Sequence, residues 1–420
     1  MKDNTARKLK GIPAGYLAVG VDPHKKRHAA VAITQDLTVR GKFKFANSRA
    51  GFEEALERAR GEMVNAGCRG MIFAIEAASH FWRNFAYSLE ERGIPFRLVN
   101  AFTLKRRREG KDLNRNKNDF RDALVGAQLL WSGEFTETKL PQGVYAELRA
   151  GYNAYRRLVE ERTGIKNLLK GLLDGLFPEF TQVFKDPCGQ TALGVLATCP
   201  VPRPMAAMPE GEFVAVIRAS HRGRLMKKKL KALHQLASTS IGIDQGCQSV
   251  AAEVQFLAER LHLIGGQVER IEKVLVSLVN ETEEGRYLLS VPGLNYVSVA
   301  GLLAELGPFR SYSNAKQLIK MAGTNPTASE SAGKSKSHTP MSKKGRGGLR
   351  YCAWNAVIPL LRHNPDFRAW GKRFRERPAH AHPLNAKEVI GAALNRLLRL
   401  AFALVNKRCL YRLPQPVAAD

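Results

Sequence analysis

Two aspartates, Asp119 and Asp122, stand three residues apart in the stretch Lys-Asn-Asp-Phe-Arg-Asp-Ala, directly before an apolar run at 123–130. That run predicts a helix, and residues three apart lie on one face of a helix. Two carboxylates there repel each other unless a cation lies between them, and Mg²⁺ takes such hard oxygen ligands. The alternative is a solvated helix start, where acidic residues interact favourably with the helix dipole. Carboxylates elsewhere in the chain decide between the two.

Two further acids, Asp22 and Glu76, each end a short apolar run that predicts a strand. We expect these strands to be neighbours, so that both carboxylates lie at one edge of a sheet, with the aspartate pair on a helix packed beside them. Four acids at one point predict a site for two Mg²⁺ ions, or Mn²⁺, of the kind that stabilises the attacking and leaving oxygens of phosphoryl transfer. Lys117 and Arg121, beside the aspartate pair, are predicted to contact a phosphate.

The elements that must position these acids follow from hydrophobic alternation and periodicity. Strands are predicted over 16–22, 27–34, 38–45, 71–75 and 95–99, and helices over 51–66, over 80–92 and from 117 onward. The first three strands read as an antiparallel meander. Residues 100–116 read as a basic loop after a short helix. The order β-β-β-α-β-α-β-α predicts an α/β domain over residues 1–135, with a mixed sheet and helices on its faces.

The charge of the whole chain predicts a polyanionic partner. The 420 residues contain 66 Lys and Arg against 38 Asp and Glu, a formal net charge of +28, and nucleic acid is the usual partner of such a cation. No apolar run reaches membrane-spanning length and the N-terminus lacks the apolar core of a signal peptide, so we expect a cytoplasmic protein without a membrane partner. Six scattered cysteines without a Cys-x-x-Cys pair argue against a zinc site and a disulfide framework.

Residues 136–285 predict a helical middle domain. Helices are expected over 145–176 and 213–237, and the second carries Lys227, Lys228 and Lys229, which form either a solvated face or a phosphate contact. Apolar residues then alternate four and three apart, which predicts a coiled coil: Val250, Val254, Leu257, Leu261, Ile264, Val268, Ile271, Leu275 and Leu278. Its partner is either the 145–176 helix, in an antiparallel pair that also dimerises, or a second chain.

Residues 286–420 predict an all-α domain. The run 288–294 and the helix expected from 297 resemble a helix-hairpin-helix, in which Gly293 of the Pro-Gly turn would offer its backbone to a DNA phosphate; a plain helix–turn–helix is the alternative. The Gly-rich loop that follows suits a phosphate backbone, although a charged linker has the same composition. Its basic residues are Lys334, Lys336, Lys343, Lys344, Arg346 and Arg350. His380 and His382 lack a nearby carboxylate and are expected to be exposed rather than metal-bound.

Several of these motifs together resemble those of RuvC-like nucleases with an RNase H fold. More narrowly, they resemble the DEDD transposases of the insertion-sequence IS110 family, which include Piv-type DNA invertases. The matching stretches are Val-Gly-Val-Asp-Pro-His-Lys at 19–25, the strand-end Glu76, and 117–123. The resemblance extends to a C-terminal serine transposase domain: it aligns Ser331 with the nucleophilic serine of that family, with Ser329 as the alternative, and the Gly-x-x-x-Leu-Arg ending matches at 345–350.

The resemblance implies a transposase or site-specific recombinase. In it the serine would attack a DNA phosphodiester and form a covalent phosphoserine link, which conserves the bond energy for rejoining. It also implies dimers and tetramers, in which the acidic domain of one subunit completes the serine site of another. In part of the family it implies a structured non-coding guide RNA. The resemblance implies a bacterial protein associated with the nucleoid.

Three other interpretations were weighed. An actin-like sugar kinase also begins strand–Asp–turn–strand, but it needs a Gly-rich turn where this chain has Pro-His-Lys-Lys at 23–26. A metal-only RuvC-like endonuclease or junction resolvase would use the same acids, with Ser331 as a DNA contact. A non-catalytic nucleic-acid-binding scaffold would need neither.

Overall fold

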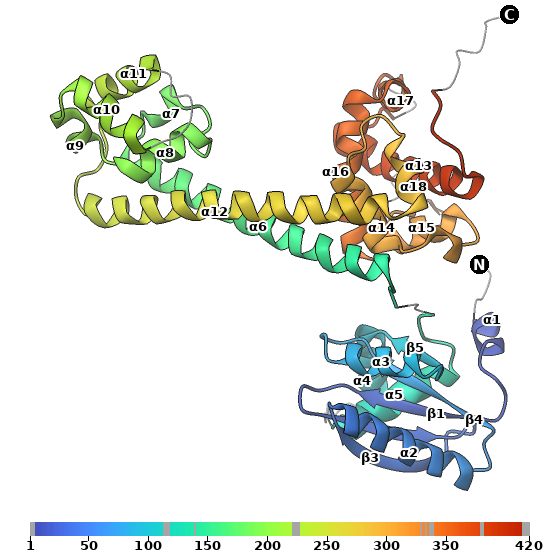
Figure 1. Cartoon of the computed structure of the whole chain (residues 1–420). Helices are drawn as coiled ribbons and strands as arrows, with labels where there is room; N and C mark the ends of the chain where they lie inside the picture. Colours follow the sequence, from blue (N-terminus) through green and yellow to red (C-terminus); the bar gives the residue numbers. More distant parts are fainter. Residues whose placement is uncertain are drawn as a thin grey trace, which may run out of the picture. The chain divides into compact units, whose positions relative to one another are not determined.

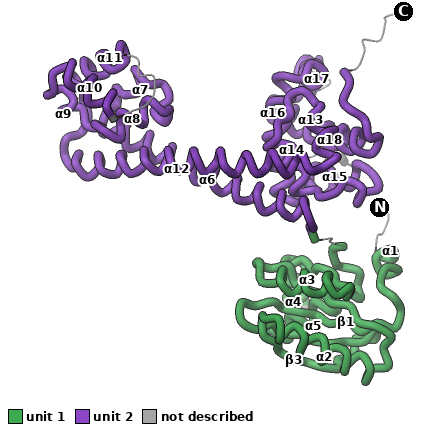
Figure 2. The backbone as a smooth tube through the Cα atoms, in the orientation of Figure 1, with its two compact units in different colours: residues 1–140 green, residues 141–420 purple. Residues whose placement is uncertain are grey.

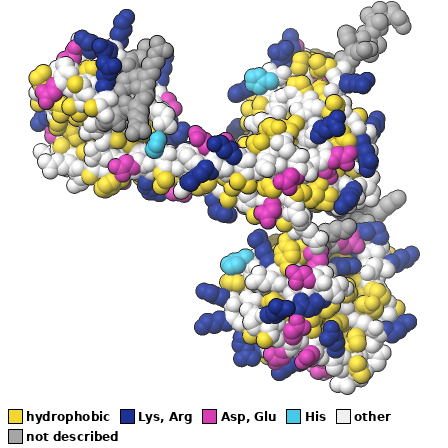
Figure 3. All heavy atoms as spheres, viewed as in Figure 1, with side chains coloured by type: hydrophobic (Ala, Val, Ile, Leu, Met, Phe, Trp, Pro, Cys, Tyr) yellow, Lys and Arg dark blue, Asp and Glu magenta, His cyan; other side chains and the backbone are white. Residues whose placement is uncertain are grey.

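The computed structural model describes residues 5–111, 118–137, 140–220, 227–327, 330–331, 334–335, 340–378 and 382–413. The chain divides into two compact units, residues 1–140 and 141–420 (Figure 2). Among the described residues, no helix combines the length and the apolar character that a bilayer crossing requires. Lys and Arg side chains are spread over the visible faces of both units, with Asp and Glu between them (Figure 3).

Unit 1 is built on a five-stranded mixed sheet in the order β3-β2-β1-β4-β5. Its strands are β1 (Tyr16–Asp22), β2 (Arg27–Ile33), β3 (Val39–Ala46), β4 (Gly70–Glu76) and β5 (Phe96–Val99). The first three strands pair antiparallel, and β4 pairs parallel with both β1 and β5. The predicted meander and the predicted adjacency of β1 and β4 are confirmed, and so is the mixed α/β class.

Helices cover both faces of this sheet, which is why β1 is buried from Leu17 to its end. Leu17, Val19 and Val21 pack with α2 (Arg49–Asn65) and α3 (Trp82–Glu91). Ala18 faces the opposite side, toward α4 (Ala101–Lys111) and α5 (Asp119–Trp131). The short helix α1 (Thr5–Lys10) was not predicted, and α4 occupies most of the stretch that was predicted as a loop.

Unit 2 is helical and is organised on two long helices, α6 (Val144–Leu176) and α12 (Cys247–Asn280) (Figure 1). They run antiparallel, since Arg260 of α12 pairs with Glu161 of α6 at 3.0 Å while Leu275 lies against Gly151. Six of the nine predicted heptad residues are buried, and α12 continues through Gly265 and Gly266 without a break. The antiparallel pairing within the chain agrees with one of the two predicted alternatives, and a coiled coil between chains stays a prediction.

Two helical clusters occupy opposite ends of the α6–α12 pair (Figure 1). One core is formed around α7 (Phe180–Val183), α8 (Gln190–Thr198), α9 (Pro202–Ala207), α10 (Glu210–Ser220) and α11 (Lys227–Ser238). The other is formed around α13 (Glu283–Leu289), α14 (Tyr296–Leu306), α15 (Ala315–Ala322), α16 (Gly347–His363), α17 (Pro365–Arg375) and α18 (Ala386–Lys407). The predicted helical character of residues 286–420 is confirmed apart from two short strands, β6 (Glu330–Ser331) and β7 (Lys334–Ser335), which pair antiparallel. A helix-hairpin-helix stays a prediction.

Candidate active site

The two strand-end acids lie side by side at one edge of the sheet. The parallel register of β1 and β4 pairs Val21 with Ile75, so Asp22 and Glu76 are the next residues on the two neighbouring strands. Residues in register on parallel strands face the same side, and alternation places both acids on the face that α5 covers. Asp22 is 6% exposed and Glu76 is partly buried. The expectation that these two strands would be neighbours is therefore confirmed.

A close backbone contact brings the aspartate pair to this edge. A Cβ on Gly20 would overlap the carbonyl oxygen of Ala123 and lie 2.8 Å from the amide of Ala127, so only glycine lets α5 approach β1 this closely. The helix begins at Asp119, with Asn118 as its N-cap accepting from the Phe120 amide at 3.0 Å. The contact with Gly20 therefore sets the first turn of α5 beside the end of β1.

A histidine bridges two of the acids. His24 follows β1 in the turn, and its Nε2 lies 3.1 Å from Oδ2 of Asp22 and 3.4 Å from Oδ1 of Asp119. One ligand atom from each of the three residues lies within 4.8 Å of the other two. Asp22 and Asp119 thus converge on one point from a strand end and a helix start, as expected for a metal site.

Two cations pair with the aspartates at the start of α5. Lys44 is in register with Ala29, which is in register with Asp22, so it lies on the same face and its Nζ reaches Oδ2 of Asp119 at 3.0 Å. On the other side, Nη1 of Arg108 lies 2.6 Å from both carboxylate oxygens of Asp122. Only 4% of the Asp122 side chain is exposed, so this ion pair is largely shielded from water.

The charge balance around Asp22 is unfavourable to its ionised carboxylate. The pKa of Asp22 is raised by burial, and the neighbouring carboxylates of Asp122 and Asp119 raise it further, while His24 opposes them. A divalent cation would relieve this repulsion, and carboxylate oxygens are the ligands that Mg²⁺ prefers. The residues present therefore fit a divalent metal.

The sequence did not predict His24, Lys44 and Arg108 as functional residues. His24 belongs to the motif at 19–25 that resembles the transposase family, and Lys44 lies on a predicted strand with alternating polar residues. Each was therefore weakly indicated by the sequence. Arg108 was not indicated, because its pairing with Asp122 depends on how α4 packs against α5. Lys44 and Arg108 place positive charge beside Asp119 and Asp122, and the His24 ring nitrogen lies between Asp22 and Asp119.

The predicted nucleophile lies in a hairpin of unit 2. Ser331 in β6 (Glu330–Ser331) pairs with Lys334 in β7 (Lys334–Ser335). The base of the hairpin is fixed to α18: the Thr324 hydroxyl donates to Oδ1 of Asn395 at 2.5 Å, and Nδ2 of Asn395 donates to the Thr324 carbonyl at 3.1 Å. The glycine Gly345 is needed here because a Cβ on it would overlap the backbone at 321–323.

The predicted nucleic-acid contacts divide into two groups. Lys227, Lys228, Lys229, Lys343 and Lys344 are exposed, although the ammonium of Lys229 lies 5.5 Å from the ring centroid of Phe184. In the second group, Arg346, Arg350 and Gly293 form contacts within the fold. Lys117, Ser329, Lys336 and His380 lie outside the described residues.

Three of the predicted contacts have packing roles. Arg346 donates to the Glu305 carbonyl at 2.6 Å, and burial lowers its pKa. Arg350 donates to the Ala322 carbonyl at 2.9 Å. Gly293 adopts a φ of +99° and packs against Leu360 of α16, so packing accounts for a glycine there.

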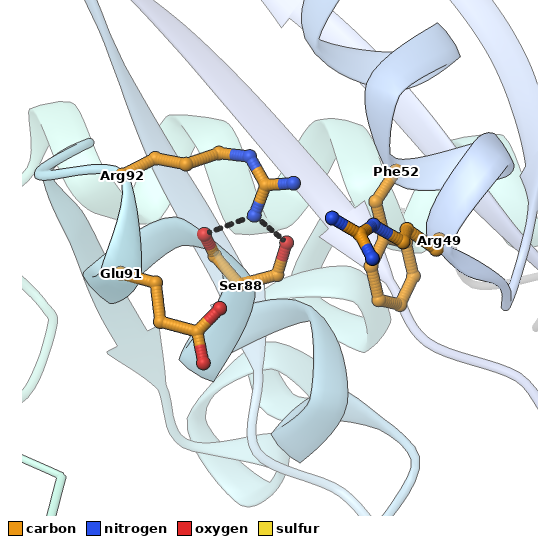
Figure 4. A pocket seen from close by; sticks show the side chains of 5 residues that line it. All are labelled: Arg49, Phe52, Ser88, Glu91 and Arg92. Atoms are coloured by element: carbon orange, nitrogen blue, oxygen red, sulfur yellow. Dashed lines mark hydrogen bonds between the residues drawn. The ribbon is translucent and has the colours of Figure 1, made fainter.

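A separate cavity of about 340 Å³ lies on the opposite face of the sheet, between α2 and α3. It is lined by Arg49, Phe52, Ser88, Glu91 and Arg92 (Figure 4). The Arg92 guanidinium donates to the carbonyl and hydroxyl oxygens of Ser88, and Arg49 extends over the Phe52 ring from the other side. None of the four acids lines this cavity.

Two family models match the parts of the chain that carry the acids and the serine. A family model for DEDD transposases of the IS110 type matches residues 19–178, the part with all four acids, and a model for the transposase IS116/IS110/IS902 family matches residues 285–371, the part with the serine hairpin. The transposase assigned to the IS117 mini-circle of Streptomyces coelicolor is 25% identical over 315 residues, covering 72% of this chain and 74% of that protein.

A second relative matches over a longer span. The 44.8 kDa protein of insertion element IS116 from Streptomyces clavuligerus is 23% identical over 385 residues, covering 87% of this chain and 90% of that protein. The two family models together span both the acidic edge and the serine hairpin, in the order in which this chain carries them. The chain belongs to the IS110 family of transposases.

Proposed function

We propose that this transposase cuts and rejoins DNA strands by phosphoryl transfer at Asp22, Glu76, Asp119 and Asp122, with Ser331 as nucleophile. The observation that carries the proposal is the convergence of a buried strand-end aspartate, whose pKa is raised, with the aspartates of the first turn of α5. Two Mg²⁺ ions, or Mn²⁺ ions, held by the four acids would stabilise charge on the attacking and leaving oxygens.

The chain's own residues have distinct parts in this proposal. The Ser331 hydroxyl loses its proton and attacks phosphorus, the bond to a sugar oxygen breaks, and that oxygen takes up a proton. The phosphoserine link conserves the bond energy, so attack by another DNA hydroxyl rejoins the strand without ATP. A serine hydroxyl needs activation. The loop around it supplies Lys343 and Lys344, both exposed, to hold a phosphate.

We further propose that a structured non-coding RNA from the element guides the reaction, and that the working form is a dimer or tetramer on DNA in the cytoplasm. The net charge of +28 accommodates both nucleic acids. Sequencing the RNA that copurifies with the full chain tests the first part. An element-end transcript is expected, and only random fragments would contradict it.

Two substitutions test the chemistry on a supercoiled DNA substrate in Mg²⁺. Asp119→Asn should lower strand cleavage by about a thousandfold, since it removes a charge from the centre of the site. The matched control is Asp36→Asn on an exposed turn, which should cleave normally. Normal cleavage by Asp119→Asn would contradict the metal site, and no cleavage by the unmodified protein would favour a non-catalytic scaffold.

Ser331→Ala should abolish covalent protein–DNA adducts on denaturing gels, and Ser335→Ala in the same hairpin should retain them. Adducts lost only in Ser329→Ala would move the nucleophile to that residue. Cleavage by Ser331→Ala without any adduct would favour the metal-only endonuclease.

A further inference from the structure

The first turn of α4 carries an aromatic ring that faces solvent. The Phe102 side chain is 61% exposed, and the guanidinium carbon of Arg106, one turn later, lies 4.5 Å from the ring centroid. The Asn100 side-chain oxygen accepts from the backbone amides of Phe102 and Thr103, at 2.8 and 3.4 Å. This cap holds the turn in place, so the ring and its cation are presented from an ordered helix start.

Arg106 differs from the basic residues around it. Its three neighbours pair with acids: Lys105 with Glu109 at 3.8 Å, Arg107 with Glu134 at 3.6 Å, and Arg108 with Asp122 at 2.6 Å. Within the part of the chain that the structure describes, Arg106 has no acidic partner and lies over the ring of Phe102. Its charge is therefore available to an anionic ligand.

The opposite face of the same helix borders the candidate active site. Leu104 is buried against the α5 side of the sheet, and Arg108 holds Asp122. Phe102 and Arg106 lie about 160° from Leu104 around the helix, on its outer face. One helix thus connects the acidic cluster with the exposed ring.

The start of α4 also lies at the edge where the acids gather. The Ala77 amide, directly after β4, donates to the Val99 carbonyl at the end of β5 at 2.9 Å. Neighbouring strands are about 4.8 Å apart, so the end of β5 lies about 10 Å from the end of β1 and Asp22. A strand bound at the acids would pass close to the first turn of α4.

We propose that Phe102 and Arg106 form a stacking site for an unpaired nucleobase of a strand that runs past the acidic cluster. Bases of single strands stack on exposed aromatic rings, and a nearby arginine adds cation–π and phosphate contacts. Bases inside a duplex are not accessible in this way. The proposal rests on the proposed function for the identity of the strand, and a nucleobase could come from DNA or from RNA.

The test uses the full chain in EDTA, with single-stranded DNA and RNA oligonucleotides that contain 2-aminopurine, whose fluorescence falls on stacking. Phe102→Leu keeps an exposed apolar side chain without a ring, and should weaken binding about tenfold and abolish the quenching. Phe102→Tyr should retain both. Arg106→Gln should lower the salt slope of binding by about 0.7. The matched control is Val64→Ala, at a 70% exposed position in the same unit, and should change nothing.

Quenching in either oligonucleotide that depends on the Phe102 ring supports the proposal, and the arm with the stronger effect identifies DNA or RNA as the source of the base. If Phe102→Leu binds and quenches both oligonucleotides as the unmodified chain does, the proposal is overturned. The exposed ring would then be expected to contact a protein partner. Because this assay contains no metal, it measures stacking without any contribution from cleavage at the acids. Failure of the metal site and failure of the stacking site are therefore separable.

Discussion

Asp22 in unit 1 and Glu305 in unit 2 are equally buried, each 6% exposed, yet their surroundings differ. Asp22 lies beside other acids: burial raises its pKa, the charges of Asp122 and Asp119 act in the same direction, and His24 opposes them. Glu305 lies among cations and amides: Nη2 of Arg149 is 3.6 Å away, and the carboxylate stands where a Cβ on Gly348 would be, at the start of α16.

The difference separates an acid whose charge is compensated by its neighbours from an acid that lies close to two others. A single buried carboxylate beside an arginine and a helix N-terminus is compensated within the protein, so it contributes to the fold. Several carboxylates at one point repel each other, and the protein gains by binding a cation there. Burial alone therefore does not distinguish Asp22 from Glu305, whereas the charges of their neighbours do.

The largest effect is expected at the arginine that compensates part of the cluster. Arg108→Gln leaves Asp122 buried without its partner and should destabilise metal-free unit 1 by about 3 kcal/mol. Arg107→Gln, whose ion pair with Glu134 is exposed, should cost about 0.5 kcal/mol or less. Hydrogen exchange of the sheet amides reports unit 1 alone.

Mg²⁺ should then restore much of the stability that Arg108→Gln loses. At about 100 times its Kd an ion that binds only the folded state adds about 2.7 kcal/mol. Equal, small losses for Arg108→Gln and Arg107→Gln would mean that the cluster is already accessible to water and needs no internal cation.

A smaller change in unfolding free energy is expected at Glu305, and its sign should differ from that at Asp22. Glu305→Gln removes the anion beside Arg149 and the half-buried Arg346 and should lower the unfolding free energy of unit 2 by about 2 kcal/mol. Asp22→Asn should leave the metal-free stability of unit 1 unchanged or raise it at pH 7.5, since burial and like charges disfavour its carboxylate. Hydrogen exchange of the α14 amides measures the stability of unit 2, and that of the β1 amides measures the stability of unit 1. Losses of the same size would remove the distinction between the two acids.

The smallest effect concerns His28, which lies beneath the site with no exposed surface. It packs among Phe45, Phe52 and Phe85, and burial lowers its pKa to about 4. The unfolded chain binds a proton near pH 6.5 while the folded chain does not, so stability is full above pH 6.5 and is lost as the pH falls toward 4. Between pH 8 and 5.5 this amounts to about 1.4 kcal/mol.

His28→Phe should remove that part of the pH dependence, and the exposed His80→Gln in the same unit should not. The comparison is between the two pH values within each variant, by exchange of the sheet amides. A pH dependence for His28→Phe equal to that of the unmodified chain would show that His28 is protonated in the folded state.

The strands of unit 1 and most of its helices followed from the sequence, whereas α1 and most of α4 did not. Alternation predicted all five strands, and chain order predicted that the Asp22 strand and the Glu76 strand would be neighbours. The helix expected from 117 begins at 119 because Asn118 caps it. These features depend on residues close in sequence, which is why hydrophobic period and capping chemistry suffice to predict them.

Contacts between distant residues were not predictable in the same way. The sequence by itself predicted that the strands ending in Asp22 and Glu76 would be neighbours and that Asp119 and Asp122 would stand on one helix. Only the tertiary structure decided that Gly20 admits the α5 backbone, that Lys44 and Arg108 compensate the acids, and that Arg346 supports the fold. Such partners are selected by strand register and helix packing, and a shift of one residue in either would present different side chains to the same point.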